Sequence, residues 1–206
     1  MAFYKDRVYP ALVRHLGNPK PILALRGRII PLARGIVLEI GAGSGVNFAY
    51  YDRANVERLF ALEPNPGMLR MADAQRLRTS LAINFLPFPG EQIPLENESV
   101  DTVVSTFTLC TIPSVDLALH DVARVLKPGG GLLFIENSLA IDRKVRRWQH
   151  LWDPIHRRIF QGLRLTRDVP SLIADAGYRL ERVESGCLSR FPKSWSHCCW
   201  GTATKR

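Results

Sequence analysis

Long hydrophobic runs are missing from this chain of 206 residues. No uninterrupted apolar stretch approaches the roughly 18 residues that a membrane-spanning helix needs. The opening segment, MAFYKDRVYP, also lacks the apolar core and the small-residue cleavage site of a secretory signal peptide. We therefore expect a soluble, cytoplasmic protein, for which peripheral contact is the one kind of membrane association left open.

Cysteine is scarce and shows no ligand spacing. The four cysteines form no C-x-x-C pair and two of them are adjacent, so we expect neither a metal site nor a disulfide framework. Reduced, mostly buried thiols are the usual state of such residues in a cytosolic protein. The four are Cys110, Cys187, Cys198 and Cys199.

Acidic residues are outnumbered, with 19 Asp and Glu against 28 Lys and Arg, which gives a formal net charge of +9. A positive field of this size favours anionic partners such as nucleic acid or lipid headgroups. The sequence lacks a basic stripe interleaved with aromatic residues, helix-turn-helix spacing and zinc-finger spacing. We therefore expect no nucleic-acid partner, and contact with an anionic membrane surface stays open.

Glycine is concentrated in one stretch, IVLEIGAGSG, at residues 36–45. Its first half is a short apolar run rich in β-branched residues, which predicts a buried parallel strand. Gly41, Gly43 and Gly45 then alternate, so the backbone can take positive φ and lie against a ligand with no Cβ in the way. A helix after this loop would point its N-terminal amides at the ligand, as in nucleotide-binding units.

The spacing of these glycines is G-x-G-x-G, which departs from the G-x-G-x-x-G fingerprint of dinucleotide binding. With an acidic residue at the end of the strand, the arrangement resembles motif I of the class I methyltransferases. That resemblance implies S-adenosylmethionine as the cofactor. The cofactor-binding residues that it implies in this stretch are Glu39, Gly41, Gly43, Gly45 and Asn47.

An acidic residue also follows the next predicted strand, 56–62, about 20 residues beyond the glycine turn. The carboxylate of this residue, Glu63, can accept hydrogen bonds from both ribose hydroxyls of an adenosine. Pro64 comes directly after it. A helix predicted over 66–79 places Met68 near its start, where it can touch the adenine.

The segment PFPGEQIPLENESVD resembles one found in the ubiquinone and menaquinone biosynthesis type of methyltransferase. That family often uses an aspartate to hold the adenine amino group, and this chain has Pro89 there. The resemblance therefore implies that backbone groups around Gly90 and Glu91 take over this contact.

The strand predicted over 100–105 leads into TFTLCTI. In the same family this segment passes under the methionine half of the cofactor and toward the methyl acceptor. The resemblance therefore implies Thr106 as a cofactor contact. It implies Thr108 and Cys110 as lining of the acceptor pocket, and no neighbouring base in the sequence supports Cys110 as a nucleophile.

The run RVLKPGGGLLFIEN resembles a segment that recurs across this methyltransferase superfamily. The motifs WQHLWDP and GLRLTRD after it resemble the vertebrate microsomal alkyl-thiol methyltransferases and their bacterial relatives. The likeness spans nearly the whole chain from about residue 3. It departs in two places, because the hydrophobic N-terminal anchor of the vertebrate enzymes is absent and Asn137 stands where many relatives have histidine. The resemblance therefore does not establish thiol specificity.

Apolar residues recur at spacings of three and four between residues 141 and 160, with arginines on the other faces. This pattern predicts a basic amphipathic helix with a kink at Pro154. We expect its apolar face, which carries Trp148 and Trp152, to roof the acceptor pocket. The basic face is as compatible with solvent as with an anionic membrane. Candidate catalytic residues are His150, His156 and Asn137, although a lone helical histidine is more often structural.

The predicted fold is α/β, a Rossmann-like class I methyltransferase fold with a seven-stranded, mostly parallel sheet and helices on both faces. We expect one domain over 1–206. Residues 1–34 would form an N-terminal helical cap, with one amphipathic helix over 3–16, and residues 138–167 a basic helical insertion over the acceptor site. KPGG at 127–130 predicts the end of the preceding helix, and a strand is predicted over 132–135. Both a monomer and a homodimer stay open.

These features together predict a methyltransferase that uses S-adenosylmethionine and acts on a small apolar or amphiphilic acceptor. A thiol, a quinone-like or phenolic compound and a phospholipid amine all fit, so the acceptor atom is open. Two other classes remain as alternatives. An NAD-dependent oxidoreductase would share the glycine loop and the ribose carboxylate, and a catalytically silent module would bind the cofactor and turn nothing over.

Overall fold

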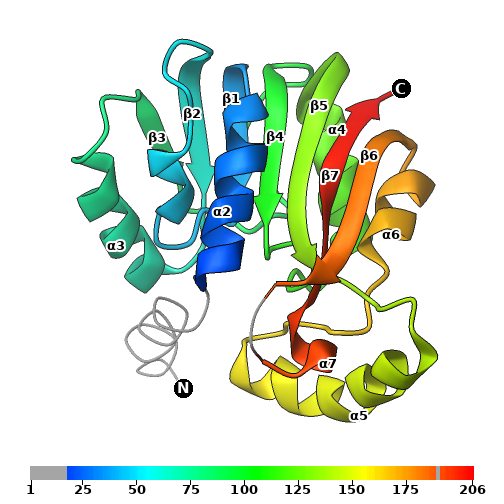
Figure 1. Ribbon diagram of the computed structural model, residues 1–206. Helices are drawn as coiled ribbons and strands as arrows, with labels where there is room; N and C mark the ends of the chain where they lie inside the picture. The colour runs from blue at the N-terminus through cyan, green and yellow to red at the C-terminus, as the bar shows by residue number, and fades with distance from the viewer. Residues whose placement is uncertain (1–17, 189–190) are drawn as a thin grey trace.

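The computed structural model describes residues 18–188 and 191–206. Its centre is a sheet of seven strands (Figure 1). The strands are β1 (Gly35–Ile40), β2 (Val56–Leu62), β3 (Ile83–Leu86), β4 (Val100–Thr106), β5 (Leu126–Asn137), β6 (Tyr178–Cys187) and β7 (His197–Lys205). The helices of the described residues are α2 (Lys20–Ile29), α3 (Pro66–Arg76), α4 (Val115–Val125), α5 (Arg143–Ile159), α6 (Val169–Asp175) and α7 (Lys193–Ser196), with the 3-10 turns η2 (Ile30–Leu32) and η3 (Val46–Ala49).

The strands lie in the order β3-β2-β1-β4-β5-β7-β6. Neighbouring strands from β3 to β5 pair in parallel, whereas β7 is antiparallel to both β5 and β6. This arrangement confirms the predicted Rossmann-like sheet with seven mostly parallel strands. The order reverses direction between β1 and β4, which is the place where sheets of this kind bind ligands.

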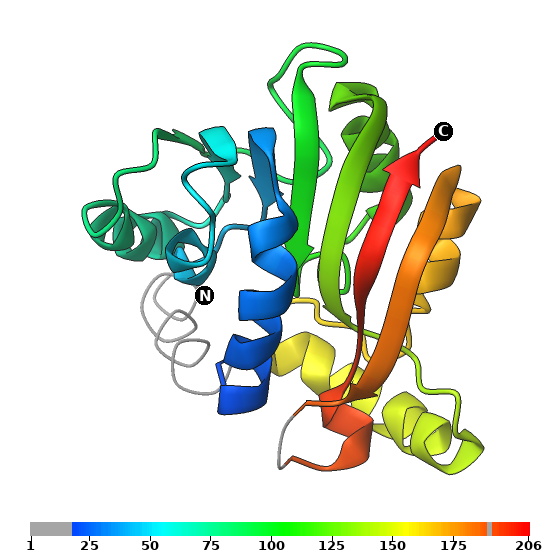
Figure 2. The same ribbon diagram turned by 45° about the horizontal axis from the view of Figure 1, so that its top comes forward.

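Helices cover both faces of the sheet, because successive residues of each buried strand point to opposite sides. Leu38 and Ile40 of β1 pack with α4 and α6, while Val37 packs with α2, α3 and η3. Figures 1 and 2 show α2 in front of the sheet and α4 behind it. The central strands β1, β4 and β5 are therefore buried on both sides over most of their length.

Two predicted boundaries differ from the structure. The segment KPGG does not precede β5 but lies within it, because the pairing of β4 with β5 begins at Val100 and Leu126, shifts register, and resumes at Thr102 and Gly131. The extra residues form a bulge in the strand. The helix predicted over 3–16 lies outside the described residues.

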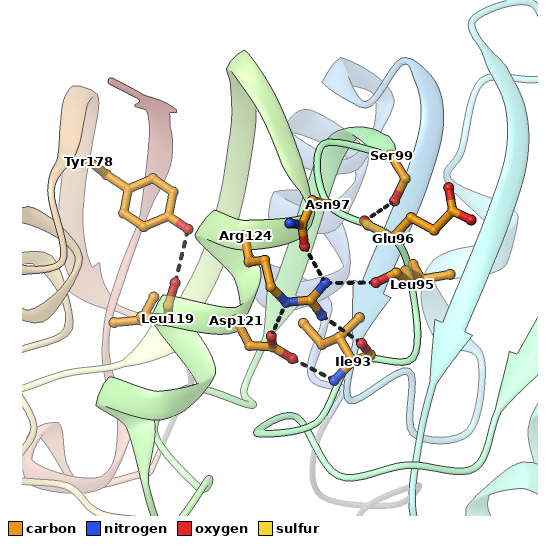
Figure 3. A network of polar contacts seen from close by, with 9 residues as sticks. All are labelled: Ile93, Leu95, Glu96, Asn97, Ser99, Leu119, Asp121, Arg124 and Tyr178. Carbon is orange, nitrogen blue, oxygen red and sulfur yellow. Dashed lines mark hydrogen bonds and ion pairs between the residues drawn. The ribbon is translucent and has the colours of Figure 1, made fainter.

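A polar cluster fixes the loop between β3 and β4, which carries Gly90 and Glu91. Arg124 of α4 donates to the carbonyl oxygens of Ile93 and Leu95, both at 2.8 Å, and pairs with Asp121 at 2.6 Å (Figure 3). Asp121 in turn accepts from the amide of Ile93 at 2.6 Å. A loop without regular structure is thus held at its backbone by one helix, and its position relative to the sheet is defined.

Helices α5 and α7 lie beyond the carboxyl ends of the parallel strands, at the lower edge of the molecule in Figure 1. The face of α5 that points inward differs from the one predicted. Its buried residues are Gln149, Asp153 and His156, whereas Trp148 and Ile155 are exposed. No helix of the described ranges combines the length and the apolar character needed to cross a membrane.

Candidate functional site

A cavity of about 480 Å³ opens where β1, β2 and β4 end. Its volume is within the range of about 300–1,000 Å³ that small-molecule sites occupy. One end, the cofactor end, is lined by loops that directly follow these strands, and the other, the acceptor end, is lined mainly by aromatic and aliphatic side chains. The lining at the cofactor end includes Gly41, Ala42, Gly43, Ser44, Asn47, Glu63, Pro64, Met68, Pro89, Gly90, Glu91 and Thr106. The lining at the acceptor end includes Thr108, Ile112, Asn137, His156, Phe160, Leu163, Leu188, Trp195 and Cys198.

The glycine loop after β1 is shaped by two different requirements. Gly41, at φ +64°, has no room for a side chain, because a Cβ there would lie 2.2 Å from Oγ1 of Thr108. Gly43, at φ +56°, faces open space, since the nearest heavy atom to a Cβ would be the carbonyl oxygen of Gly41 at 3.9 Å. Because Gly43 also lines the cavity, its bare backbone leaves room for a ligand.

Glu63 lies at the end of β2 with both carboxylate oxygens engaged by backbone amides. One oxygen accepts from Gly43 at 2.9 Å and the other from Asn65 at 2.8 Å. Burial raises the pKa of this carboxyl, and the two amides oppose that shift. Each carboxylate oxygen has a further lone pair, so the group can also accept from hydroxyls of a ligand in the cavity. This fits the ribose of an adenosine.

A buried polar network lies beneath the glycine loop. Glu39 accepts from Nδ2 of Asn47 and from the hydroxyl of Tyr51, both at 2.8 Å. Burial raises the pKa of Glu39 to about 7, against the effect of these two donors and of Arg26. Nη1 of Arg26 donates to Asn47 and, at 3.1 Å, to Thr106. The network joins α2, β1, η3 and β4 at one point.

The guanidinium of Arg26 is buried at the wall of the cavity, and its Nε has no partner within the described residues. A cation buried at the wall of a cavity is stabilised by a ligand of opposite charge. The carboxylate of an amino acid is a group with the matching charge and geometry. Glu63 and Arg26 therefore both fit a ligand that carries a nucleoside and an amino-acid carboxylate.

Other predicted contacts of the cofactor end are grouped around Glu63. Met68 is buried near the start of α3, whose first amides are capped by the side chain of Asn65. Gly90 and Glu91 line the opposite wall, and a Cβ on Gly90 would lie 2.6 Å from Ile112. Of the predicted cofactor contacts, Glu39 and Gly45 do not line the cavity, and Glu39 instead lies beneath the glycine loop, where it accepts from Asn47.

A buried acid, Glu136 at the end of β5, organises the loop after β4. Its Oε1 accepts from Ser105 Oγ at 2.6 Å and from the amides of Thr108 and Leu109 at 3.0 and 3.1 Å, and its Oε2 accepts from the amide of Cys110 at 3.1 Å. Burial raises the pKa of Glu136. The loop that joins the two ends of the cavity is thereby held at consecutive backbone amides.

His156 is an ionisable ring that lines the acceptor end. It is stacked on Phe160 at 5.5 Å between ring centroids and meets the edge of Trp195 at 4.8 Å. Its Nδ1 lies 3.2 Å from the carbonyl oxygen of Trp152, and because a carbonyl only accepts, Nδ1 carries the proton. Burial lowers the pKa of His156, so the ring is neutral near pH 7 and Nε2 keeps a lone pair.

Asn137 and Cys198 lie side by side in the same wall. The Cys198 thiol donates to Oδ1 of Asn137 at 3.3 Å. Burial raises the pKa of Cys198 far above its usual value, so the group is a thiol and not a nucleophile at neutral pH. Asn137 carries no ionisable group, and its contribution here is a polar contact.

Several predicted pocket residues lie elsewhere. Trp148 and His150 are exposed on α5, outside the cavity lining, because the helix buries its polar face instead of its apolar one. Trp152 does not line the cavity either, and packs edge-on against Trp195 at 5.3 Å. Cys110 is fully buried beside Glu136, and this burial raises the pKa of its thiol. Thr108 is the one predicted acceptor-pocket residue that does line the cavity.

Arg26, Glu136 and Trp195 were not predicted as site residues. Two of them left a signal in the sequence. Arg26 falls within the apolar spacing of Ile22, Leu25 and Ile29 in α2, where a charge is out of place. Glu136 directly follows four apolar residues of a buried strand. Trp195 comes from a short helix far along the chain, and nothing in its local sequence connects it to the cavity.

Comparisons with known proteins indicate the class of protein. Residues 38–134 match a family described as a methyltransferase domain. Human thiol S-methyltransferase TMT1A is 29% identical over 80% of this chain and 67% of its own length. The ubiquinone/menaquinone biosynthesis C-methyltransferase UbiE of Bartonella tribocorum is 32% identical over 50% of this chain and 41% of its own. A solved S-adenosylmethionine dependent methyltransferase from Mesorhizobium loti has the same fold, with a TM-score of 0.64 at 17% identity over 90% of this chain and 96% of that one.

The fold defines a Rossmann-like class I protein, and its cavity lies at the switch point of the sheet. Residues 38–134 carry this methyltransferase domain, and S-adenosylmethionine is the cofactor. The chain spans about two fifths to two thirds of the length of the two enzymes compared above. Within the described ranges no cluster of three or more potential ligands could hold a metal ion.

Proposed function

We propose that this protein transfers a methyl group from S-adenosylmethionine to the sulfur of a small apolar or amphiphilic thiol. The observation that carries the proposal is one continuous cavity, which has Glu63 at one end and a neutral buried histidine between aromatic rings at the other. The relative TMT1A is named a thiol S-methyltransferase. The similarity to it supports a thiol as the acceptor over a quinone-like compound or a phospholipid amine.

At the cofactor end, each residue would act through binding. Glu63 would accept from the ribose hydroxyls, and the amide of Gly43 beside it would lie against the ligand. Arg26 would pair with the amino-acid carboxylate, with its position fixed by Asn47 and Thr106. Met68 and the backbone around Gly90 would enclose the adenine. When bound, the cofactor supplies a methyl group on a positively charged sulfur. A lone pair of the acceptor would attack the methyl carbon in line with the carbon–sulfur bond, and the electrons of that bond would stay on the cofactor sulfur.

At the acceptor end, the chain would orient the acceptor and remove one proton. A thiol must lose its S–H proton as the new S–CH₃ bond forms, and Nε2 of His156 is the lone pair available to take it. The carbonyl of Trp152 holds the ring in the tautomer that leaves Nε2 free. Phe160, Trp195 and Ile112 would surround the sulfur with apolar surface and exclude water, which favours a thiol over a hydrophilic acceptor.

The test is methyl transfer to an alkyl thiol by the wild type and by His156→Asn. We expect the substitution to lower kcat by about 100-fold or more, as is typical for loss of a general base, with cofactor affinity unchanged. In the wild type the rate should rise with pH through the pKa of His156, which burial holds below 6.5, and then level off. This rising limb should be absent in His156→Asn.

The matched control is His150→Asn, since His150 lies on the same helix but is exposed outside the cavity. It should leave kcat and the pH profile as in the wild type. Equal losses in both variants, or an unchanged pH profile in His156→Asn, would refute the role of His156. Methylation of a phenol or of a phospholipid amine in preference to every thiol offered would refute the proposed acceptor.

A further inference from the structure

The outward face of α5 carries a row of large apolar side chains in contact with solvent. Trp148, Leu151 and Ile155 have exposed fractions of 55%, 63% and 47%. Their spacings of three and four residues place them on one side of the helix, and we call them the outer stripe. Ile141, just before the helix, is exposed as well. Apolar residues this large are seldom grouped on the surface of a soluble protein without a partner.

The rotation of α5 that exposes the outer stripe is fixed by buried polar contacts. Gln149 accepts from the amide of Ala140 at 2.8 Å and donates to the carbonyl of Ser138 at 2.9 Å. Asp153 accepts from the amide of Leu165 at 2.7 Å. Turning the apolar face inward would leave these backbone groups unpaired, at a cost of about 1–3 kcal/mol for each buried group. The outer stripe is therefore a stable feature of this surface.

Positive charge borders the outer stripe along the whole helix. Lys144 lies one turn before Trp148, Arg147 one turn before Leu151, and Arg158 one turn after Ile155, all exposed. The helix has a single acidic residue, Asp153, which is buried and paired with Arg157 at 3.2 Å. The exposed cations of the helix are Arg143, Lys144, Arg146, Arg147, Arg157 and Arg158.

We propose that the outer stripe and its bordering cations dock on an anionic lipid surface, with α5 parallel to the membrane plane. The stripe would enter the apolar side of the interface with Trp148 at headgroup level, and the cations would contact lipid phosphates. Charge selects this occupant over a second copy of the chain, because packing two such faces together would bring six like charges into one interface, from Lys144, Arg147 and Arg158 of each copy.

Docking in this way would connect the membrane to the cavity through one helix. The inward face of α5 supplies His156 to the acceptor end, while its outward face would hold the lipid, so the acceptor end would lie on the membrane side of the sheet. Membrane docking would thus give acceptors dissolved in lipid a short path to the cavity. The binding itself does not depend on which acceptor is methylated.

The test is flotation of the full chain with vesicles of phosphatidylcholine, alone or mixed equally with phosphatidylglycerol. We expect the wild type to float with the anionic vesicles and not with the neutral ones. Adding anionic vesicles should shift the tryptophan emission of the wild type to shorter wavelength. The shift should be absent or smaller in Trp148→Phe, which would assign it to Trp148. Replacing one bordering cation, as in Arg147→Gln, should weaken binding about fivefold.

Leu151→Glu is the decisive variant, because it places a charge in the stripe and should weaken binding about tenfold or more. Its matched control is Leu117→Glu, since Leu117 of α4 is 61% exposed and lies away from α5. Both variants should unfold at the temperature of the wild type. Equal binding of the two variants, binding to neutral vesicles alone, or a wild-type dimer that only Leu151→Glu dissociates would each overturn the proposal.

Discussion

The two ends of the cavity are built in different ways. The cofactor end consists of loops that directly follow β1 and β2, and its main groups are backbone amides, glycines and one carboxylate. The acceptor end is assembled from side chains of α5, α7 and the loop after β4, which are distant in the sequence. Short local motifs can therefore encode the first end, whereas the second exists only after the chain has folded.

The strongest test of this contrast concerns Gly43. Alanine there should weaken binding of S-adenosylmethionine by about 100-fold or more, because its Cβ would occupy cavity space that the ligand needs. Calorimetric titration would measure the loss. Gly129→Ala is the control, since Gly129 has φ +71° and nothing within 4 Å of a Cβ. Both variants should lose about 1–2 kcal/mol of stability from the left-handed backbone, but only Gly43→Ala should lose affinity.

The raised pKa of Glu39, beneath the cofactor end, leads us to predict that the free energy of unfolding depends on pH. Its pKa is raised from 4.5 to about 7, so folding favours the protonated form. The contribution is complete below pH 4.5 and is lost as pH rises through 7, which should lower the free energy of unfolding by about 3 kcal/mol across this range. Glu39→Gln should remove most of this slope in denaturant titrations at several pH values. A slope that persists unchanged would mean that another buried acid is responsible.

Substitution of Glu63 tests whether this carboxylate contacts the ligand at the cofactor end. Glu63→Gln keeps the shape of the side chain but removes its charge and one acceptor, so we expect the affinity for S-adenosylhomocysteine to fall about 30-fold. Glu57→Gln, at an exposed position of the same strand, should bind as the wild type does. If the two variants bind alike, Glu63 does not contact the ligand.

Arg26 should give the smallest effect of the series. Arg26→Gln removes the cation at the cavity wall, and we expect about a tenfold loss of affinity for S-adenosylmethionine. The loss should be smaller for an analogue that lacks the amino-acid carboxylate, because that group is the proposed partner. Arg28→Gln is the control on the same helix, since Arg28 points to solvent and pairs only loosely with Glu184 at 3.7 Å. An equal loss for both ligands would contradict the pairing.

The sequence was sufficient to predict the seven-stranded, mostly parallel sheet, and most of the residues that it predicts as cofactor contacts line one cavity. These features depend on local rules, in which a buried strand is followed by glycines and then by an acid at the next strand end. Gly43, Glu63 and Gly90 lie in one cavity for this reason. The bulge within β5 was not predicted, because KPGG usually ends an element and only the pairing with β4 shows that the strand continues.

The orientation of α5 was predicted wrongly, and the reason is general. Periodicity shows that a helix has an apolar side, but not whether the interior of the protein or another phase lies against it. Here Gln149 and Asp153 satisfy backbone groups that are distant in the sequence, so the polar face turns inward. Trp148 was therefore assigned to the pocket although it is exposed.

Methyl transfer by the wild type to a matched set of acceptors is the most direct test of the central claim, that one cavity joins a cofactor end to an acceptor end built for a thiol. The set contains an alkyl thiol, a phenol and a phospholipid amine, each offered with S-adenosylmethionine labelled on its methyl group. We predict that the label appears on the sulfur of the thiol, at a rate that depends on His156. Cofactor binding with no labelled product from any acceptor, or label on the phenol or amine alone, would contradict the account.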